Sequence, residues 1–415
     1  MADFYREIKS RTATIRHLEA KIRELDHERQ TYLDILNTPG YPRTIPAEIL
    51  GEIFQHTLSG LAPSTLPREI TKVCQVCRDW RAVAESTPRL WSSISITLGK
   101  RGPCFNKLRR WISRARDVPI SIEIGEYNHR KPEDCHLLRA GLLSQLLPQI
   151  PVLGGLSIHS KSSCCVRKFA TAINAPLQNG NGLLDTNLRS LELAIQELEE
   201  DDHSSSDPTF NLGPLPLHSL TSLSLCLPAL PWDSTVVLSE LPQLPALPRL
   251  ETLSLKCDWA AIWFLTVIGS CKNITELSID FVSGRTDLDD SNLLPLTGSS
   301  EHMLVLPKLN RLQVQNLSIR DDHNHSRFLR YLALPSLNAL QLSFQDKEAP
   351  FDEIEYWEHC RRPDQNDIIR DISALIDNSG CTATLQHLEI HFLTISSRGL
   401  ASILFKLPSI THLTL

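Results

Sequence analysis

The sequence predicts a mixed α and β protein: an N-terminal helix and a small all-α module, followed by an irregular α/β solenoid. Three observations support this fold class. Apolar residues recur every seven positions over residues 3–37, they lie at helical spacing between residues 46 and 84, and a six-residue leucine pattern recurs through most of the remainder. Helices and strands require different apolar periods, so the changes of period divide the chain into residues 1–40, 41–95 and 96–415.

Composition and charge are those of an ordinary globular protein. The 415 residues carry a formal net charge of -6, which draws the chain neither to nucleic acid nor to an acidic membrane surface. The N-terminus has no apolar signal segment, and the longest apolar run, residues 260–268, is too short to span a bilayer. We therefore expect an intracellular protein, cytoplasmic or nuclear, with no membrane or nucleic-acid partner and with its 11 cysteines reduced.

Residues 1–40 are predicted to form one amphipathic helix that ends before Pro39. Two interleaved apolar series carry the seven-residue period: Ile8, Ile15, Ile22 and Leu36, and Leu18, Leu25 and Tyr32. Arg29 interrupts this stripe, and the balanced charges elsewhere predict a solvated outer face. The stripe either packs against its own domain or joins two copies through residues 3–37. Because only about five heptads are available, such a homodimer would be weak.

Residues 41–95 are predicted to form a small helical module. The segment IPAEILGEIFQHTL places Ile49, Ile53 and Phe54 on one helical face, and Pro46 occupies the helix start, where its missing N–H is not needed. A polar loop, SGLAPSTLPRE, follows this helix. A second helix is predicted over residues 70–84, because apolar residues again recur at helical spacing there.

The second helix contains a Cys-x-x-Cys pair, Cys74 and Cys77. Such a pair can be half of a zinc or redox site, or it can belong to a buried helix face. Val73, Cys77, Trp80 and Ala84 fall on one face at helical spacing, and no second Cys or His pair lies at zinc-finger spacing. We therefore expect both cysteines to behave as small buried hydrophobic residues in a core or docking surface.

The remainder of the chain repeats the pattern L-x-x-L-x-L, with isoleucine and valine variants. Its middle apolar position falls at Leu156, Leu191, Leu223, Leu253, Leu277, Leu312, Leu340, Leu388 and Leu413. The L-x-L part predicts a strand with alternate side chains inward, and stacked units share a core that one unit cannot form, so a solenoid is expected. Ile94 and Ile122 mark degenerate earlier copies, and residues 259–268 and 368–376 are predicted return helices.

Three insertions interrupt the repeats, near residues 196–213, 283–303 and 345–367. The first two are acidic and polar, which predicts loops without fixed structure. The third also contains Phe351, Tyr356 and Trp357, which either fold back onto the scaffold or remain available to a partner. The last repeat strand stops at Leu415, so it is either an exposed edge or the end of a truncated product.

The sequence contains no recognisable catalytic motif. It lacks a G-x-S-x-G segment, a phosphate-binding loop and a dinucleotide-binding glycine pattern. The segment DDHNH, residues 321–325, follows a repeat strand directly and is better interpreted as a solvated loop than as a metal site. We expect a non-enzymatic protein without catalytic residues, cofactor or metal, because an enzyme would need a pocket with convergent titratable groups.

The helical module resembles an F-box. The segments IPAEIL, EIF and VCRDWRAVA match the family pattern, and STPRLWSSI together with LRRWISRARDVPISIEI resembles the version common in fungal F-box proteins. The resemblance covers roughly residues 41–125, and the repeats fit the leucine-rich-repeat class in general pattern. The resemblance implies a non-catalytic substrate receptor of a Skp–cullin–F-box ubiquitin ligase. A non-degradative interaction scaffold is the alternative.

The resemblance also implies which residues meet the Skp-type adaptor and, through it, the cullin scaffold. Carried over by position, the adaptor-binding residues are Ile45, Pro46, Ile49, Val76, Cys77 and Trp80. Ile53 and Phe54 are expected to be more internal, and Ile45 replaces the usual leucine.

An unidentified target protein is expected to bind the exposed strand positions of the solenoid. These positions flank the inward leucines and vary in charge from unit to unit: Glu192, Lys256, Glu276, Asp280, Arg311, Gln313, Gln341, His387, Glu389 and His391. Such variety suits recognition of one particular protein surface, and a merely solvated strand face is the alternative for each residue.

Overall fold

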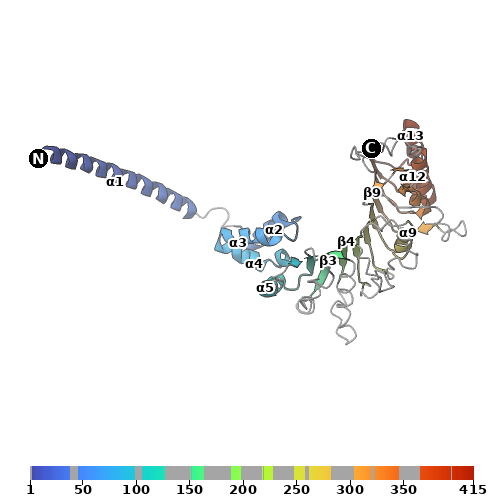
Figure 1. Cartoon of the computed structure of the whole chain (residues 1–415), viewed down its shortest axis with the longest axis horizontal. Helices are drawn as coiled ribbons and strands as arrows, with labels where there is room; N and C mark the ends of the chain where they lie inside the picture. The colour runs from blue at the N-terminus through green and yellow to red at the C-terminus, as the bar shows by residue number, and fades with distance from the viewer. Residues whose placement is uncertain are drawn as a thin grey trace, which may run out of the picture. The chain divides into compact units, whose positions relative to one another are not determined.

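The computed structural model describes most of the helices and strands and leaves the long insertions aside. The described residues are 2–37, 45–98, 105–126, 150, 152–162, 188–197, 217, 219–227, 247–257, 261–281, 303–317, 319–320, 323–344, 365–393 and 395–415. The chain divides into two compact units, Met1–Leu90 and Trp91–Leu415 (Figure 1). Helices precede a long parallel sheet, so the predicted mixed α/β class is confirmed. Most of each predicted insertion lies outside the described residues, and so do Phe351, Tyr356 and Trp357 of the third one.

The described part of the first unit contains four α-helices. They are α1 (Ala2–Asn37), α2 (Ala47–Leu58), α3 (Leu66–Val76) and α4 (Arg78–Ser86). The heptad stripe of α1 forms on one continuous helix, but its central apolar side chains, from Ile8 to Leu25, are 46% to 58% exposed. The structure therefore does not bear out the interpretation that this stripe packs against the described part of its own chain.

Helices α2, α3 and α4 pack around one small apolar core. Its buried side chains are Leu50, Phe54, Leu58, Leu66, Ile70, Val83 and Ala84. The helix starts follow from the sequence: Pro46 precedes α2 with φ -54° and ψ 144°, and a second proline lies in the first turn of α3, where no intrahelical N–H bond is lost. A core of this size leaves other apolar residues of the module uncovered.

The prediction of a single helix over residues 70–84 is wrong, because the helix is interrupted at Cys77. This residue is extended, with φ -156° and ψ 175°, and it separates α3 from α4. Its Sγ accepts a hydrogen bond of 3.4 Å from the backbone N–H of Trp80, so the thiol caps the start of α4. Cys77 is exposed and Cys74 is half-buried, which also corrects the expectation that both are buried.

In the described residues of the second unit, eleven parallel strands form one sheet in chain order. They are β1 (Ser93–Leu98), β2 (Ile120–Glu126), β3 (Leu153–Ser162), β4 (Ser190–Glu197), β5 (Ser222–Cys226), β6 (Thr252–Lys256), β7 (Glu276–Asp280), β9 (Arg311–Leu317), β13 (Ala339–Phe344), β14 (His387–His391) and β15 (His412–Thr414). Because β1 belongs to this sheet, the sheet begins before residue 96.

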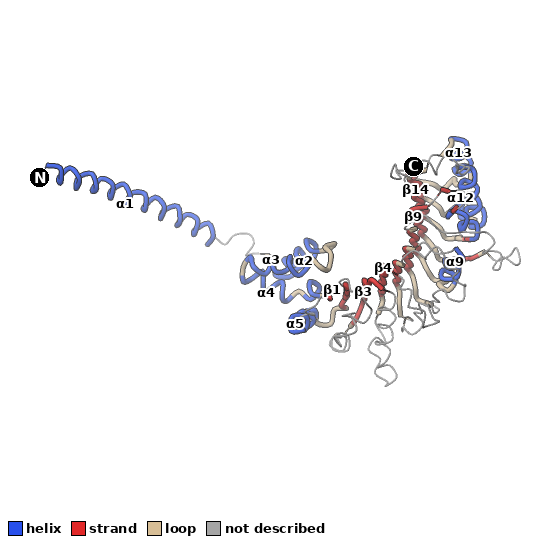
Figure 2. Tube along the Cα trace, in the orientation of Figure 1, coloured by secondary structure: helices blue, strands red, loops and turns tan. Residues whose placement is uncertain are grey.

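Short elements connect these strands. The described helices between them are α5 (Phe105–Ala115), α9 (Ala261–Gly269), η7 (His325–Tyr331), α12 (Gln365–Ser379), η9 (Cys381–Ala383) and α13 (Ser397–Phe405), while η2 (Pro88–Trp91) precedes β1. The small strands are β8 (Leu304–Val305), β10 (Ile319–Arg320), β11 (His323–Asn324) and β12 (Leu332–Ala333). The two predicted return helices correspond to α9 and α12, and Figure 2 shows that α9, α12 and α13 lie on one side of the strands.

The strand register confirms the alignment of the repeats. All nine middle leucines, from Leu156 to Leu413, are direct partners along one ladder, which continues through Ile122 to Ile94 on the first two strands. The leucines of this ladder from β4 to β14 are buried, whereas Leu413 on the final strand is exposed. Because each unit covers the leucine of its neighbour, only an outermost strand leaves one uncovered.

A turn before many strands sets this register. In the Leu-Pro-x-Leu segments, the N–H of the second leucine bonds to the carbonyl of the first, as from Leu250 to Leu247 at 3.2 Å. Proline suits the second position of such a turn, because its φ is already fixed near the required value. The carbonyl of Thr221 then accepts two N–H groups from the next unit, Glu251 and Thr252, and the same pattern recurs along the sheet.

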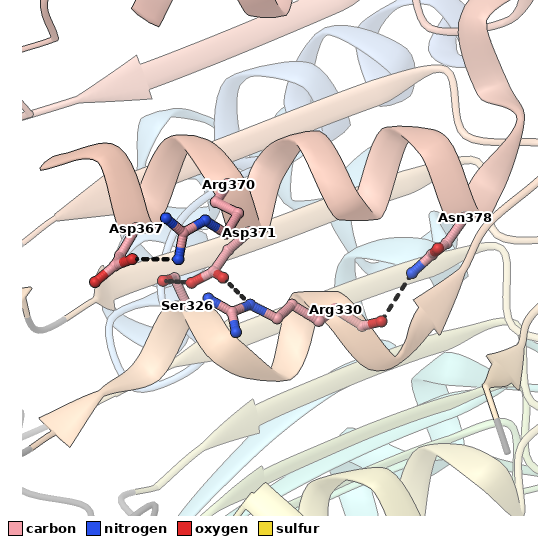
Figure 3. Close-up of polar contacts among 6 residues, drawn as sticks. All are labelled: Ser326, Arg330, Asp367, Arg370, Asp371 and Asn378. Carbon is pink, nitrogen blue, oxygen red and sulfur yellow. Dashed lines mark hydrogen bonds and ion pairs between the residues drawn. The ribbon is translucent and has the colours of Figure 1, made fainter. Parts of the chain in front are cut away.

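A buried polar cluster holds α12 against η7 (Figure 3). The carboxylate of Asp371 is fully buried, accepts a hydrogen bond of 2.5 Å from the Ser326 hydroxyl and pairs with the guanidinium Nε of Arg330. Asn378, two turns further along α12, donates to the backbone carbonyl of Arg330 at 2.8 Å. Burial raises the pKa of Asp371, while the bonds from Ser326 and Arg330 act in the opposite direction.

Candidate functional site

Apolar side chains remain exposed on the outer sides of α2 and α3. Ile49 and Ile53, one turn apart on α2, are 52% and 44% exposed, and Val76 at the end of α3 is 60% exposed. Exposure of Ile53 corrects the expectation that it is internal, whereas Phe54 is buried as expected. Large exposed apolar residues in so small a module are typical of a surface that a partner covers.

Two of the predicted docking residues, Ile45 and Pro46, lie at the entry to α2. Ile45 is half-buried and Pro46 is exposed, and the carbonyl of Pro46 accepts the N–H of Leu50 at 3.0 Å. This bond fixes the direction in which α2 begins. Pro46 and Ile49 are three residues apart, so helical geometry places them on the same side of α2 as Ile53.

Trp80 has a structural role as well as a predicted docking role. Its ring lies 5.0 Å from the ring of Phe54, at an interplanar angle of 56°, and this contact joins α4 to α2. Trp80 is half-buried, and its backbone N–H is the donor that Cys77 Sγ accepts. Arg81 Nε donates to the carbonyl of Cys74 at 3.0 Å, so both sides of the break between α3 and α4 are fixed.

Of the six predicted docking residues, the structure therefore joins Cys77 to Trp80 by a direct contact. The others lie at the start of α2, on its exposed side and at the end of α3. Ile53, like Cys77, was assigned to the interior by sequence reasoning and is exposed in the structure. Ile53 lies four residues after Ile49, and this spacing already places the two side chains on one face of α2. The spacing does not show which side of α2 packs against α4.

A close contact fixes the end of α4 against α2 and yields a stability prediction. A Cβ atom added to Gly51 would lie 2.9 Å from the Thr87 hydroxyl, which donates to the carbonyl of Val83 at 2.7 Å. We expect Gly51→Val to destabilise the module by about 1–3 kcal/mol in thermal unfolding, because this hydroxyl must move. Glu52→Val, on the exposed neighbour in the same helix, should change stability by less than about 0.5 kcal/mol.

The predicted target-binding residues all lie on the face of the sheet opposite the buried leucines, and none of them is buried among the described residues. The register groups nine of them into three adjacent rows: Glu276, Arg311 and His387; Glu192, Gln313, Gln341 and Glu389; and Lys256 and Asp280. His391 ends β14, beyond the register shift between β9 and β13. Neighbouring strands bring several of them together. Glu276 is the direct partner of Arg311, and Lys256 Nζ lies 2.7 Å from Asp280 Oδ2.

Several polar contacts on this face were not predicted from the sequence. Ser157 Oγ donates to Glu192 Oε2 at 2.8 Å and lies 2.9 Å from His159 Nε2. The rings of His387 and His412 stack at 4.4 Å. Each pair joins adjacent strands or alternate positions of one strand, so the pairs become apparent only once the register is known. They give this face a fixed pattern of donors and acceptors.

An ion pair joins β6 to β7, and a half-buried thiol lies beside it on β5. The hydrogen bond to Asp280 raises the pKa of Lys256, which remains a cation paired with that carboxylate. Burial raises the pKa of the Cys226 thiol on the adjacent strand. A thiol with a raised pKa remains protonated near neutral pH, so Cys226 is a poor nucleophile.

The described residues show no arrangement that would hold a metal ion. Among them, no group of three or more His, Cys, Asp and Glu side chains is placed to coordinate one. In the same residues, no helix combines the length and the apolar character that crossing a membrane requires.

Comparison with known proteins identifies the helical module. No curated protein matches the chain. A family model described as F-box-like matches residues 43–97, which include α2, α3, α4 and most of β1. The chain therefore carries an F-box-like domain at residues 43–97, followed by a solenoid of parallel strands.

Proposed function

We propose that this protein is the substrate-receptor subunit of a Skp–cullin–F-box type ubiquitin ligase. In this proposal, the F-box-like domain binds a Skp-type adaptor and, through it, a cullin scaffold, while the solenoid binds a target protein. The exposure of Ile49, Ile53 and Val76 within residues 43–97 is the main support, because it leaves apolar surface in the one module whose family binds such adaptors.

Burial of these side chains supplies the driving force for docking. Complete burial of one large aliphatic side chain stabilises a complex by roughly 1.5–3 kcal/mol, and these residues are about half exposed in the free module. Several such residues together offset the entropy lost on association. The Cys77 cap and the Phe54–Trp80 contact hold α2, α3 and α4 in place beforehand, so little further ordering is required.

The strand face supports target binding in the same proposal. Its rows combine both charges, amides and histidines on a rigid parallel sheet, and adjacent strands present them at regular spacing. A surface of this kind recognises a partner by complementary charge and hydrogen bonding. The protein positions its target and leaves ubiquitin transfer to the other subunits.

The proposal is tested by assembly from purified components. The full chain should bind a Skp-type adaptor directly, and it should retain a cullin only when that adaptor is present. Both results are read by size-exclusion chromatography of the mixtures. Failure to bind the adaptor, or retention of the cullin without it, would contradict the proposal.

A non-degradative scaffold is the second candidate, because the F-box-like domain accounts for adaptor binding alone. Proteins captured by the solenoid distinguish the two functions. A receptor predicts that the half-life of a captured target lengthens when the ligase is inhibited, whereas a scaffold predicts an unchanged half-life.

A further inference from the structure

Helix α1 presents an apolar face that no described residue of the chain covers. Its 36 residues correspond to a rod about 54 Å long. In heptad terms, Ile8, Ile15 and Ile22 occupy the first core position, a, and Leu18 and Leu25 occupy the second, d. Each of these five side chains is about half exposed.

We propose that α1 joins two copies of this chain in a parallel, in-register, two-stranded coiled coil. The core residues favour this arrangement, because β-branched isoleucine at a and leucine at d select parallel dimers over larger assemblies. A second copy is therefore the partner whose surface this stripe fits.

Two arginines interrupt the core, and the structure shows how each is neutralised. Arg11 at a d position bonds to Glu7 at 2.6 Å, and Arg29 at an a position lies 3.9 Å from Asp26. Both carboxylates stand on flanking positions, Glu7 at g and Asp26 at e. The guanidinium groups are thereby drawn to the edge of the seam, while their aliphatic stems cover it. Polar residues at core positions weaken a coiled coil but fix its register.

The flanking charges decide the direction of the second helix. In a parallel dimer, a g residue faces the e residue five positions later on the other helix, so Lys21 faces Asp26 of the second copy, once on each side. In the chain alone, Lys21 bonds to Glu24 at 2.8 Å, and this exposed bond would be exchanged for the new pair. Each new pair has opposite charges.

The antiparallel alternative places like charges together. Aligning Ile15 with Leu25 of the second copy brings Lys21 opposite Lys21 and Glu19 opposite Glu19 at the flanking positions. The two core arginines face arginines in either direction, so they do not distinguish the two arrangements. Like-charge contacts at flanking positions disfavour an arrangement, so the charge pattern selects the parallel dimer.

The dimer would carry two F-box-like domains and two solenoids. Dimerisation itself rests only on α1, whereas its consequence rests on the proposed receptor function: a target with two recognition sites would be held at both. Such binding raises the apparent affinity without any new contact, because the second binding step becomes intramolecular.

The experiment measures self-association of the full chain by sedimentation equilibrium. The wild-type chain should dimerise in the micromolar range. Lys21→Glu and Asp26→Lys should each raise the dissociation constant by about tenfold, because each replaces two attractive pairs by two repulsive ones. An equimolar mixture of the two variants should restore the wild-type constant, since the mixed dimer again has two opposite-charge pairs.

Two further variants test the core itself. Ile15→Asp with Ile22→Asp should abolish dimerisation, while Ala13→Asp with Ala20→Asp, the same changes on the outer face, should retain it. A monomeric wild-type chain, a dimer that survives the core change, or charge variants that alone or mixed do not differ from wild type would overturn the proposal. Adaptor binding is measured separately, so failure of either proposal is distinguishable from failure of the other.

Discussion

Ile49→Asp combined with Val76→Asp is expected to weaken binding of a Skp-type adaptor by at least about a hundredfold. Both side chains are more than half exposed, so the substitutions leave the core of the module intact. In the complex, each new carboxylate would lie against apolar surface without a partner, at a cost of roughly 2 kcal/mol or more. Isothermal titration calorimetry of the full chain with purified adaptor measures the change directly.

Leu61→Asp provides a matched control. Leu61 is 40% exposed in the same module, but it lies after the end of α2 and outside the predicted docking set. This variant should bind the adaptor as tightly as wild type. All variants should retain the wild-type melting temperature. Unchanged affinity in the double variant would show that the adaptor binds elsewhere on the module.

Trp80→Ala gives a less direct test of the same surface. The substitution also removes the contact between the Trp80 and Phe54 rings, which joins α4 to α2. Weaker adaptor binding by this variant could therefore result from the loss of a contact with the adaptor or from destabilisation of the module. The exposed residues separate these effects, because they contribute little to the core.

The repeat ladder could be predicted from the sequence because its cause is local. L-x-L alternation makes the strand, the Leu-Pro turn fixes where the strand begins, and burial requires the leucines of adjacent units to meet. Leu223 and Leu253 thus pair directly, as the pattern predicts. The polar contacts of the strand face depend on which side chains meet across strands, and periodicity within one strand does not specify that.

Two features of the helical module could not be predicted because they depend on tertiary contacts. Residues 70–84 keep an apolar helical period through Cys77, so the pattern does not reveal the extended residue between α3 and α4. In α2, helical spacing places Ile53 and Phe54 on the same broad face. The tertiary contact with Trp80 shows that Phe54 is buried, while Ile53 is exposed. The docking residues themselves remain a prediction that the binding experiments address.

In the solenoid, Asp371→Ala is expected to reduce the free energy of unfolding by about 3 kcal/mol. Removing the carboxylate leaves the buried Ser326 hydroxyl and the Arg330 guanidinium without their shared acceptor. Arg330 is partly exposed and recovers some hydration, which keeps the loss at the lower end for a buried pair. Hydrogen exchange of the α12 amides and chemical denaturation of the full chain measure the effect.

Asp367→Ala is the matched control. The Asp367 carboxylate also pairs with an arginine, Arg370, but this pair lies at the exposed surface of α12. Its loss should cost less than about 0.5 kcal/mol. An equal loss in both variants would show that the buried cluster in Figure 3 adds nothing beyond an ordinary surface pair.

The pH dependence of the wild-type chain provides an independent check on this cluster. Burial is the largest influence on Asp371 and raises its pKa in the folded state above the value of 3.8 expected for an exposed aspartate. The folded state therefore binds this proton more tightly than the unfolded state does, and the contribution of this group to stability increases as pH falls through the folded pKa. The Asp371→Asn variant has no ionisable carboxyl group at this position, so it serves as the reference. Relative to that variant, the wild-type chain should gain stability between neutral pH and pH 4, and a relative loss over the same range would mean that the Arg330 pairing outweighs burial.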